Sequence, residues 1–200
     1  MSMSNNPRKL KPNIFSIGHS NHPFEKFVAL LKQNNVEVVV DTRSQPYSKY
    51  APQYSSGSIE ALLKKEGIDY LFLGRELGGR PQETEFYDSE GYVLYWKLAN
   101  APKLREGVQR LEEEATTRRV AIMCSEEDPT CCHRRLLVGK VLSGRGTELE
   151  HIRSDGRIQS ENELVPAERQ NDLFNFSEKA VWRSIRSVLQ RGQLQSSSEH

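Results

Sequence analysis

The sequence predicts an α/β protein of three layers, in which helices cover both faces of a mostly parallel, five-stranded sheet. Short apolar runs alternate along the chain with segments whose apolar residues recur at helical spacing. One run, residues 36–40, is unbroken and rich in β-branched side chains, as in a strand buried on both faces of a parallel sheet. A chain of 200 residues is long enough to bury a sizeable core within one domain.

Local patterns place each element. Pro23 is a good first residue for a helix, and Phe27, Leu30 and Leu31 then share one buried face. The second strand is closed by Asp41. In chain order the expected elements are strand 14–17, the helix opened by Pro23, strand 36–40, a helix from Ser58, strand 68–73, helices 92–98 and 103–114, strand 120–124, helix 130–142 and strand 148–152.

These patterns predict one α/β domain over residues 14–153. Residues 1–13 are polar and are expected to be a flexible N-terminus. Residues 154–200 lose the sheet pattern and are expected to be a partly helical C-terminal extension. Within it, residues 174–189 could form a helix, and residues 195–200 are expected to be disordered.

Composition excludes several classes of protein. The chain has 28 Lys and Arg against 27 Asp and Glu, a net charge of +1, so its overall charge predicts no attraction to nucleic acid or to an anionic membrane. The apolar runs are too short to cross a bilayer or to act as a signal sequence, which predicts a cytoplasmic protein with no membrane contact. Three closely spaced cysteines predict reduced thiols rather than disulfides.

The stretch 120–135 holds all three cysteines and predicts a strand, a turn and a helix start. Cys124 ends the strand, and Asp128 and Pro129 suit the N-cap and first position of the helix. A thiol near free backbone N–H groups at a helix N-terminus is biased toward thiolate. Cysteine is also a small apolar residue that often ends buried strands, so a purely structural role is an equal alternative. Cys131 and Cys132 would point about 100° apart on a helix, and Cys132 is the better candidate.

Polar residues also follow the first two strands. His19 and Ser20 come after the first strand, and Asp41 and Arg43 come at the end of the second. Carboxyl ends of parallel strands share one sheet edge, so these side chains are expected near Cys124, with His19 as its base or orienting group. The alternative is that His19 and Ser20 only satisfy hydrogen bonds of the turn.

Two loops are suited to anion binding. Arg43 and Lys49 are interleaved with three tyrosines over residues 43–54, a composition suited to holding phosphate while stacking on a base. The same composition is found in ordinary surface loops. Residues 74–91 form a long, glycine-containing loop in which Arg80 could hold an anion.

A metal site is a further alternative, with Cys124, Cys132 and His133 as ligands, together with His19 or Glu126. The chain has no Cys-x-x-Cys or His-x-x-x-His pair to fix its geometry. No cofactor is assigned from the sequence. The spacing is also not that of the thiol phosphatases, because Arg134 lies too far beyond Cys124 to close their short phosphate loop.

Four stretches resemble the bacterial and archaeal family called domain of unknown function 488. They are residues 16–21, residues 41–44 with Pro46, residues 77–79, and the cluster Cys124-Ser125-Glu126 through Asp128-Pro129 to Cys132-His133-Arg134. The resemblance spans residues 14–152 and implies a compact α/β domain with these polar groups at one sheet edge. Thr42, where relatives are expected to carry an aliphatic residue, and Cys131 depart from the pattern.

Together these observations predict a cysteine-dependent transferase or hydrolase that acts on an anionic substrate derived from a nucleotide or nucleic acid. A module that binds nucleic acid or another partner without catalysis, and a Cys/His metal protein, are the alternatives. The oligomeric state is left open. The catalytic assignments are Cys124, His19, Asp41 and Glu126, and the substrate-binding assignments are Ser20, Arg43, Arg80, Cys132, His133 and Arg134.

Overall fold

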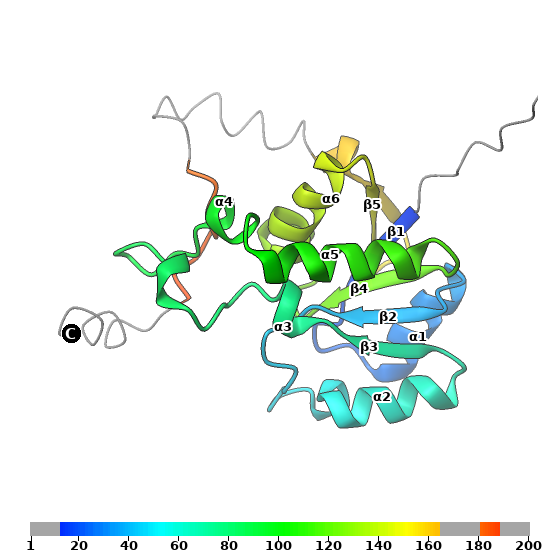
Figure 1. Ribbon diagram of the computed structural model, residues 1–200. Coiled ribbons are helices and arrows are strands. Elements are labelled where there is room, and N and C mark those ends of the chain that lie inside the picture. The colour runs from blue at the N-terminus through cyan, green and yellow to red at the C-terminus, as the bar shows by residue number, and fades with distance from the viewer. Residues whose placement is uncertain (1–12, 165–180, 189–200) are drawn as a thin grey trace, which may run out of the picture.

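The computed structural model describes residues 13–164 and 181–188 and confirms the α/β class (Figure 1). A six-stranded sheet has the order β3-β2-β4-β1-β5-β6, in which only the β5–β6 pair is antiparallel. None of the helices in the described ranges has the length and apolar character needed to cross a bilayer. The strands are β1 (Asn13–Gly18), β2 (Val38–Asp41), β3 (Asp69–Phe72), β4 (Val120–Cys124), β5 (Glu148–Ile152) and β6 (Ile158–Ser160).

Helices lie on both faces of the sheet, as predicted. A π-helical segment, Arg134–Gly139, runs directly into α6, and short 3-10 turns occupy Pro52–Tyr54, Thr84–Phe86 and Pro129–Cys131. The α-helices are α1 (Phe24–Gln33), α2 (Ser56–Lys65), α3 (Gly74–Leu77), α4 (Tyr95–Leu98), α5 (Pro102–Ala115) and α6 (Lys140–Gly144).

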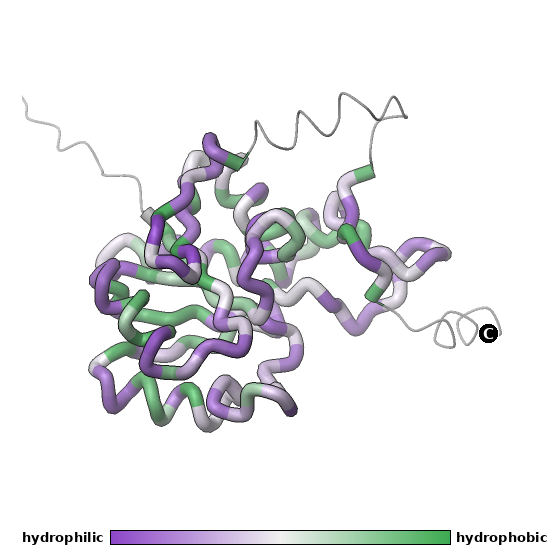
Figure 2. The backbone as a smooth tube through the Cα atoms, turned by 180° about the vertical axis from the view of Figure 1, so that it is seen from behind, coloured by the Kyte–Doolittle hydropathy of each residue, from purple (hydrophilic) through white to green (hydrophobic). Residues whose placement is uncertain are grey.

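The sheet separates two hydrophobic cores. Residues of β2 and β4 alternate between them: Val40 and Ile122 pack with α5 and the π-helical segment, whereas Val39 and Met123 pack with α1 and α2. All residues of β2 and β4 are buried, which explains why these strands are apolar without a polar alternation. Apolar residues accordingly concentrate in the strands, while the connections are mostly hydrophilic (Figure 2).

The sheet has one strand more than predicted, and it lies in the segment expected to have no sheet. β6 pairs with β5, with Ile158 opposite Ile152, after a turn in which Gly156 has a φ of +86°. Only glycine adopts such a φ readily. A strand of three residues is too short to show a period in the sequence.

The expected C-terminal helix is not present where the structure describes it. Residues 181–188 run beside residues 91–93: Ser184 N donates to the Val93 carbonyl and Val188 N to that of Gly91, at 2.9 and 3.0 Å. The rest of the proposed helix, together with residues 1–12 and 195–200, lies outside the described residues.

Two local predictions need correction. The loop 74–91 contains α3 and a 3-10 turn. The helix expected over residues 130–142 is interrupted at Cys132, which has extended backbone with φ −108° and ψ 138°. Asp128 does cap the preceding 3-10 turn, because its carboxylate accepts from Thr130 N. Cys131 and Cys132 are therefore not consecutive residues of one α-helix.

Candidate functional site

The carboxyl ends of three parallel strands meet at one edge of the sheet. Strand register places Gly18 of β1 opposite Cys124 of β4, and Asp41 of β2 opposite Met123. β1 and β4 are neighbours, yet the helices that follow them pack against opposite faces of the sheet. Such a switch point opens a crevice where ligands commonly bind in open α/β sheets. The register confirms the predicted convergence of the three strand ends.

A cavity of about 660 Å³ opens at this edge. Residues that follow all three strand ends line it, among them His19, Arg43 and Ser125. Its wall contains the cations Arg43, Lys49, Arg80 and Arg186, whereas Glu126 is its only carboxylate among the described residues. The described lining therefore carries more positive than negative side chains.

Cys124 and His133 form a pair in the wall of this cavity. The Sγ of Cys124, a residue only 4% exposed, lies 3.6 Å from His133 Nδ1. The other ring nitrogen, His133 Nε2, lies 3.0 Å from the carbonyl oxygen of Thr42. Because a carbonyl oxygen only accepts hydrogen bonds, Nε2 carries a proton, and Nδ1 is the nitrogen free to exchange one with the sulfur.

The surroundings of Cys124 favour its thiolate. A hydrogen bond from the Cys132 thiol lowers the pKa of Cys124 most; burial opposes this, and His133 and Arg134 lower it further, so the pKa lies well below its usual value. Burial, followed by the bond to Cys124, raises the pKa of Cys132 well above its usual value. Cys124 is thus the more acidic of the two thiols.

The negative charge of a Cys124 thiolate shifts the pKa values of His133 and Glu126. Burial lowers the pKa of His133, but its charge interaction and hydrogen bond with Cys124 outweigh burial and raise it above the usual value. Burial, and then the charge on Cys124, raise the pKa of Glu126, whose Oε2 lies 3.3 Å from the sulfur. The arrangement therefore favours a thiolate beside a protonated imidazole.

Arg43 is held rigidly by the residues around it. Its guanidinium binds both oxygens of Asp41, with Nε at 2.9 Å from Oδ1 and Nη2 at 2.6 Å from Oδ2, and Nη2 also donates to the Tyr54 carbonyl at 2.7 Å. Tyr70 donates to the same carboxylate at 2.7 Å. Asp41, which was assigned as catalytic from the sequence, thus fixes Arg43 at the cavity wall.

The His19 ring belongs to the Arg43 group and makes no hydrogen bond to the Cys124 sulfur, although the His19 backbone N–H donates to the Cys124 carbonyl at 3.0 Å. Its Nε2 lies 3.0 Å from Arg43 Nη1, and its Nδ1 lies 2.6 Å from the Ser20 carbonyl, which fixes a neutral ring with the proton on Nδ1. Burial, and then Arg43, lower the pKa of His19 to about 4. The ring stacks on Tyr54 at 4.2 Å. The imidazole beside the sulfur is therefore that of His133, and His19 contacts Arg43 instead.

Three predicted binding residues do not line the cavity: Arg134, Ser20 and Cys132, whose side chain is fully buried. Arg134 is 1% exposed, and its guanidinium donates to the carbonyls of Glu126 and Glu127 and to Ser16 Oγ. It holds the loop after β4 instead of meeting a ligand. Ser20 has a φ of 47° and donates its backbone N–H to the Ser125 carbonyl at 2.9 Å, so it ties two loops together.

Arg80, predicted to bind substrate, lines the cavity. Its backbone N donates to Ser44 Oγ at 2.9 Å, and its exposed guanidinium has no ion pair within the described part of the chain. Sequence reasoning missed Thr42, whose carbonyl sets the His133 tautomer, and Arg186. Backbone carbonyls carry no sequence signal, and Arg186 lies in a segment expected to be helical.

The loop after β4 packs so closely on β1 that only glycine fits at position 18. A Cβ added to Gly18 would collide with the Glu126 carbonyl oxygen and lie 2.6 Å from Glu127 Cα, both of which are backbone atoms. We expect Gly18→Ala to lower the free energy of unfolding by about 3 kcal/mol.

Urea unfolding of the Gly18→Ala variant provides the measurement. The matched control is Gly57→Ala in α2, where a Cβ meets nothing within 4 Å and alanine should stabilise the helix by about 0.5–1 kcal/mol. Equal effects at the two positions would contradict the close packing of this loop.

Four side chains of the site have the chemistry of metal ligands. The donor atoms of Cys124, Glu126, Cys132 and His133 all lie within 4.8 Å of one another. Sulfur, imidazole nitrogen and carboxylate oxygen are the ligands that zinc prefers. The sequence predicted three of these ligands and named Glu126 as one choice for the fourth.

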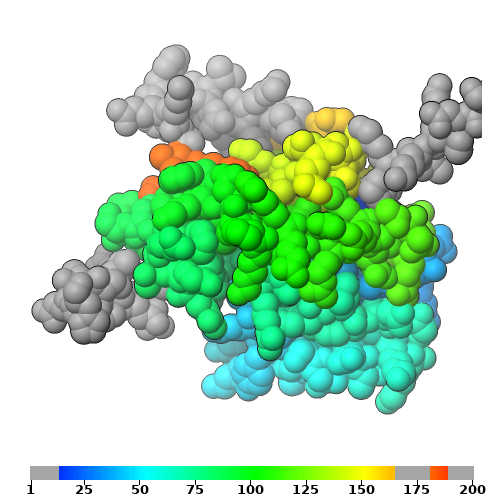
Figure 3. All heavy atoms as spheres, viewed as in Figure 1, coloured from blue at the N-terminus to red at the C-terminus, as the bar shows by residue number. Residues whose placement is uncertain are grey.

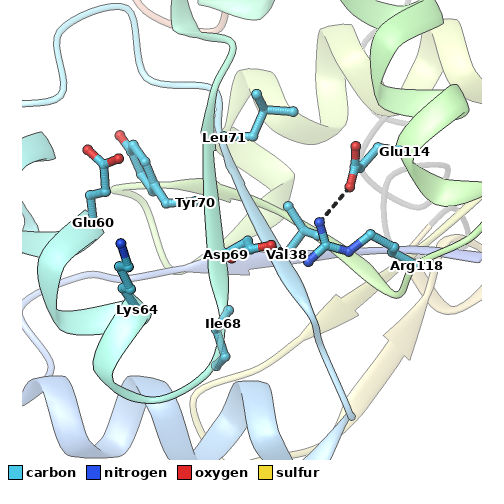
Figure 4. A pocket seen from close by; sticks show the side chains of 9 residues that line it. All are labelled: Val38, Glu60, Lys64, Ile68, Asp69, Tyr70, Leu71, Glu114 and Arg118. Atoms are coloured by element: carbon cyan, nitrogen blue, oxygen red, sulfur yellow. Dashed lines mark hydrogen bonds and ion pairs between the residues drawn. The ribbon is translucent and has the colours of Figure 1, made fainter.

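A second hollow, of about 330 Å³, lies at the β3 edge, and its described lining contains no cysteine or histidine (Figure 4). It is close to Val38 and Asp69, where β2 and β3 begin, and thus away from the carboxyl edge. Arg118 is paired there with Asp69 at 2.6 Å and with Glu114 at 3.0 Å. Within the described residues, the cavity beside Cys124 is thus the one of these two that is lined by cysteine and histidine.

Comparison with known proteins identifies a family. No curated protein and no solved structure matches the chain. The family model described as domain of unknown function DUF488 matches residues 23–141, which is more than half of the chain. The match includes Asp41, Arg43 and the cluster from Cys124 to Arg134. The chain therefore belongs to the family domain of unknown function DUF488.

Proposed function

We propose that this protein is a cysteine-dependent enzyme, a transferase or hydrolase, in which Cys124 is the nucleophile and His133 its proton acceptor. The observation that carries the proposal is the 3.6 Å approach of His133 Nδ1 to the sulfur, with Nε2 fixed on the Thr42 carbonyl. A nucleophile, a base within reach and a third group that orients the base are the parts that covalent catalysis requires.

These parts support a two-step reaction. With its proton held on His133 Nδ1, the Cys124 thiolate forms a bond to an electrophilic atom of the substrate. The bond from that atom to the leaving group breaks, and the leaving group takes the proton from His133. Water, or a second substrate, then gives a proton to His133 and attacks the same atom, which releases Cys124.

The cavity supports an anionic substrate. Arg43 is prepositioned by Asp41, and Arg80 has no carboxylate partner among the described residues. Tyr47 and Tyr50, which are 75% and 92% exposed, lie beside Lys49 in the same wall. Aromatic rings next to cations suit a base joined to a phosphate, so a nucleotide or a piece of nucleic acid is the proposed substrate class.

Thiol labelling and turnover test the nucleophile together. We expect iodoacetamide at pH 7 to alkylate Cys124 faster than Cys131. The Cys124→Ser variant should lose this labelling. It should also lose all turnover of the nucleoside phosphates and oligonucleotides that the wild type converts. Cys131→Ser, which removes the neighbouring thiol, should keep both. Ligand binding with no turnover in either protein would favour a binding module, and slow alkylation of Cys124 would overturn the proposal.

A metal protein is the second candidate, favoured by the spacing of the donor atoms. Cys124 Sγ lies 3.3 Å from Glu126 Oε2 and 3.6 Å from His133 Nδ1, and Cys132 Sγ lies 3.9 Å from the same nitrogen. Ligands at the corners of a tetrahedron around zinc are separated by about 3.3–3.8 Å, given zinc bond lengths of about 2.0–2.3 Å. The hydrogen bond of Nε2 to a carbonyl is also usual for a histidine ligand.

Elemental analysis separates the two candidates. If the metal candidate is correct, the purified chain contains one equivalent of zinc, Cys132→Ala loses it, and Cys124 alkylates only after a chelator is added. If the thiol enzyme is correct, Cys124 alkylates at the same rate with and without chelator.

A further inference from the structure

The described C-terminal segment, residues 181–188, is fastened to the domain beside α4 and α6 (Figure 3). Trp182 Nε1 donates to the Leu136 carbonyl at 2.8 Å, and Lys140 Nζ lies 4.5 Å from the centre of the same ring. Arg183 binds Asp88 at 2.6 Å and lies over the ring of Tyr92. These contacts hold the segment at a defined position.

This segment forms one wall of the cavity beside Cys124. Ser184 Oγ accepts from Val93 N at 2.9 Å, and from Ser184 onward the residues line the cavity. Residues 181–188 lie outside the part of the chain that matches the family model. The cavity is thus completed by residues that the family match does not include.

The two arginines of the segment are used differently. Arg183 is neutralised by Asp88 and Glu90, at 2.6 and 3.0 Å. Arg186 lines the cavity with an exposed side chain, and no described residue forms an ion pair with it. Burial raises the pKa of the Cys131 thiol, and the positive charge of Arg186 opposes this rise. Cys131 also lines the cavity. Arg186 thus offers its guanidinium to whatever occupies the cavity.

We propose that residues 181–188 supply an anion subsite, in which Arg186 together with Arg80 binds a phosphate group of the substrate that reacts at Cys124. The reaction at Cys124 rests on the proposed function, whereas phosphate binding does not. Arg80 comes from the loop after α3 and Arg186 from the C-terminal segment, so the subsite joins two distant parts of the chain. Two guanidinium groups that form no ion pair with a carboxylate within residues 13–164 and 181–188 suit a phosphate better than a neutral ligand.

The charge of the alkylating reagent tests the subsite directly. Iodoacetate is anionic and iodoacetamide is neutral, and both alkylate Cys124, here in a Cys131→Ser background. We expect Arg186→Ala to lower the ratio of the iodoacetate rate to the iodoacetamide rate about threefold, because the solvated cavity loses one positive charge. The effect should shrink at high salt, and Arg186→Lys should restore the ratio. Arg157→Ala, which removes an exposed cation of the β5–β6 turn outside the cavity, should leave it unchanged.

Calorimetry with pyrophosphate keeps this inference separate from the proposed function. Arg186→Ala should weaken pyrophosphate binding about tenfold, and Arg157→Ala should not. If Cys124 alkylates rapidly but Arg186→Ala changes neither the rate ratio nor pyrophosphate binding, the subsite is overturned and the thiol enzyme stands. If Cys124 is unreactive but pyrophosphate binding depends on Arg186, the proposed function fails and the subsite stands.

Discussion

Replacing His133 by asparagine is expected to slow alkylation of Cys124 at pH 7 about tenfold. The imidazole lies 3.6 Å from the sulfur, and its charge is one of the causes that lower the pKa of Cys124. A lowered pKa means that the thiolate is already populated below the pH at which an ordinary thiol ionises. Without His133 the thiolate should appear only at higher pH, so little of it remains at pH 7, although its greater intrinsic nucleophilicity offsets part of the loss.

The rate of alkylation measured from pH 5 to 10, with each cysteine followed by mass spectrometry, checks this. Cys131 is an internal reference in the same chain, because burial, and then Asp128, raise its pKa above the usual value. The wild type should label Cys124 in the acid part of the range and Cys131 only at alkaline pH. A profile of Cys124 that is the same in His133→Asn and wild type would exclude His133 as its partner.

Replacing Arg134 by methionine is expected to lower the free energy of unfolding by about 3 kcal/mol. Methionine fills much of the same volume, but it leaves the carbonyls of Glu126 and Glu127 and the hydroxyl of Ser16 without their donor. Hydrogen bonds from a charged donor contribute about 1.5–3 kcal/mol each, and buried acceptors without partners are costly. The loop that carries Glu126 beside Cys124 should loosen in the same variant.

Urea unfolding measures this effect, with Arg145→Ala as the control. Arg145 is about half exposed and binds Glu112 at 2.7 Å on the surface, so its loss should cost less than about 1 kcal/mol. Arg134→Lys should recover little of the lost stability. The planar guanidinium of arginine reaches both carbonyls and the hydroxyl at once, and the single ammonium group of lysine cannot. A loss below about 1 kcal/mol in Arg134→Met would show that the loop is held by other contacts.

The parallel sheet was predictable because burial leaves a pattern in the sequence. Strands such as β2 and β4, covered on both faces, are unbroken apolar runs, and α1 and α5 show one apolar face each. β6 was missed because three half-buried residues show no period. The break at Cys132 was missed because Cys131 and Cys132 are ordinary helix residues by propensity, and only packing decides their backbone.

The location of the candidate site was predictable from the sequence, but the contacts between its side chains were less so. Strand ends at a switch point must converge, and His19, Asp41, Arg43 and Cys124 do. Which histidine meets the sulfur depends on side-chain direction, and spacing in the sequence does not encode it. Thr42 and Ser20 act through backbone carbonyls on His133 and His19, and any residue type supplies a carbonyl.

The short strand β6 leads into a chain of hydrogen-bonded side chains that reaches the core, and this changes where the domain ends. Ser16 Oγ lies 2.6 Å from His151 Nδ1, and His151 Nε2 lies 2.8 Å from Glu161, which also binds Arg135 at 2.9 Å. A chain stopped at residue 153 would bury His151 without that carboxylate and would leave one edge of β5 open to pairing with other molecules. The shortest fragment suited to expression therefore extends past Glu161, well beyond the last residue that matches the family model.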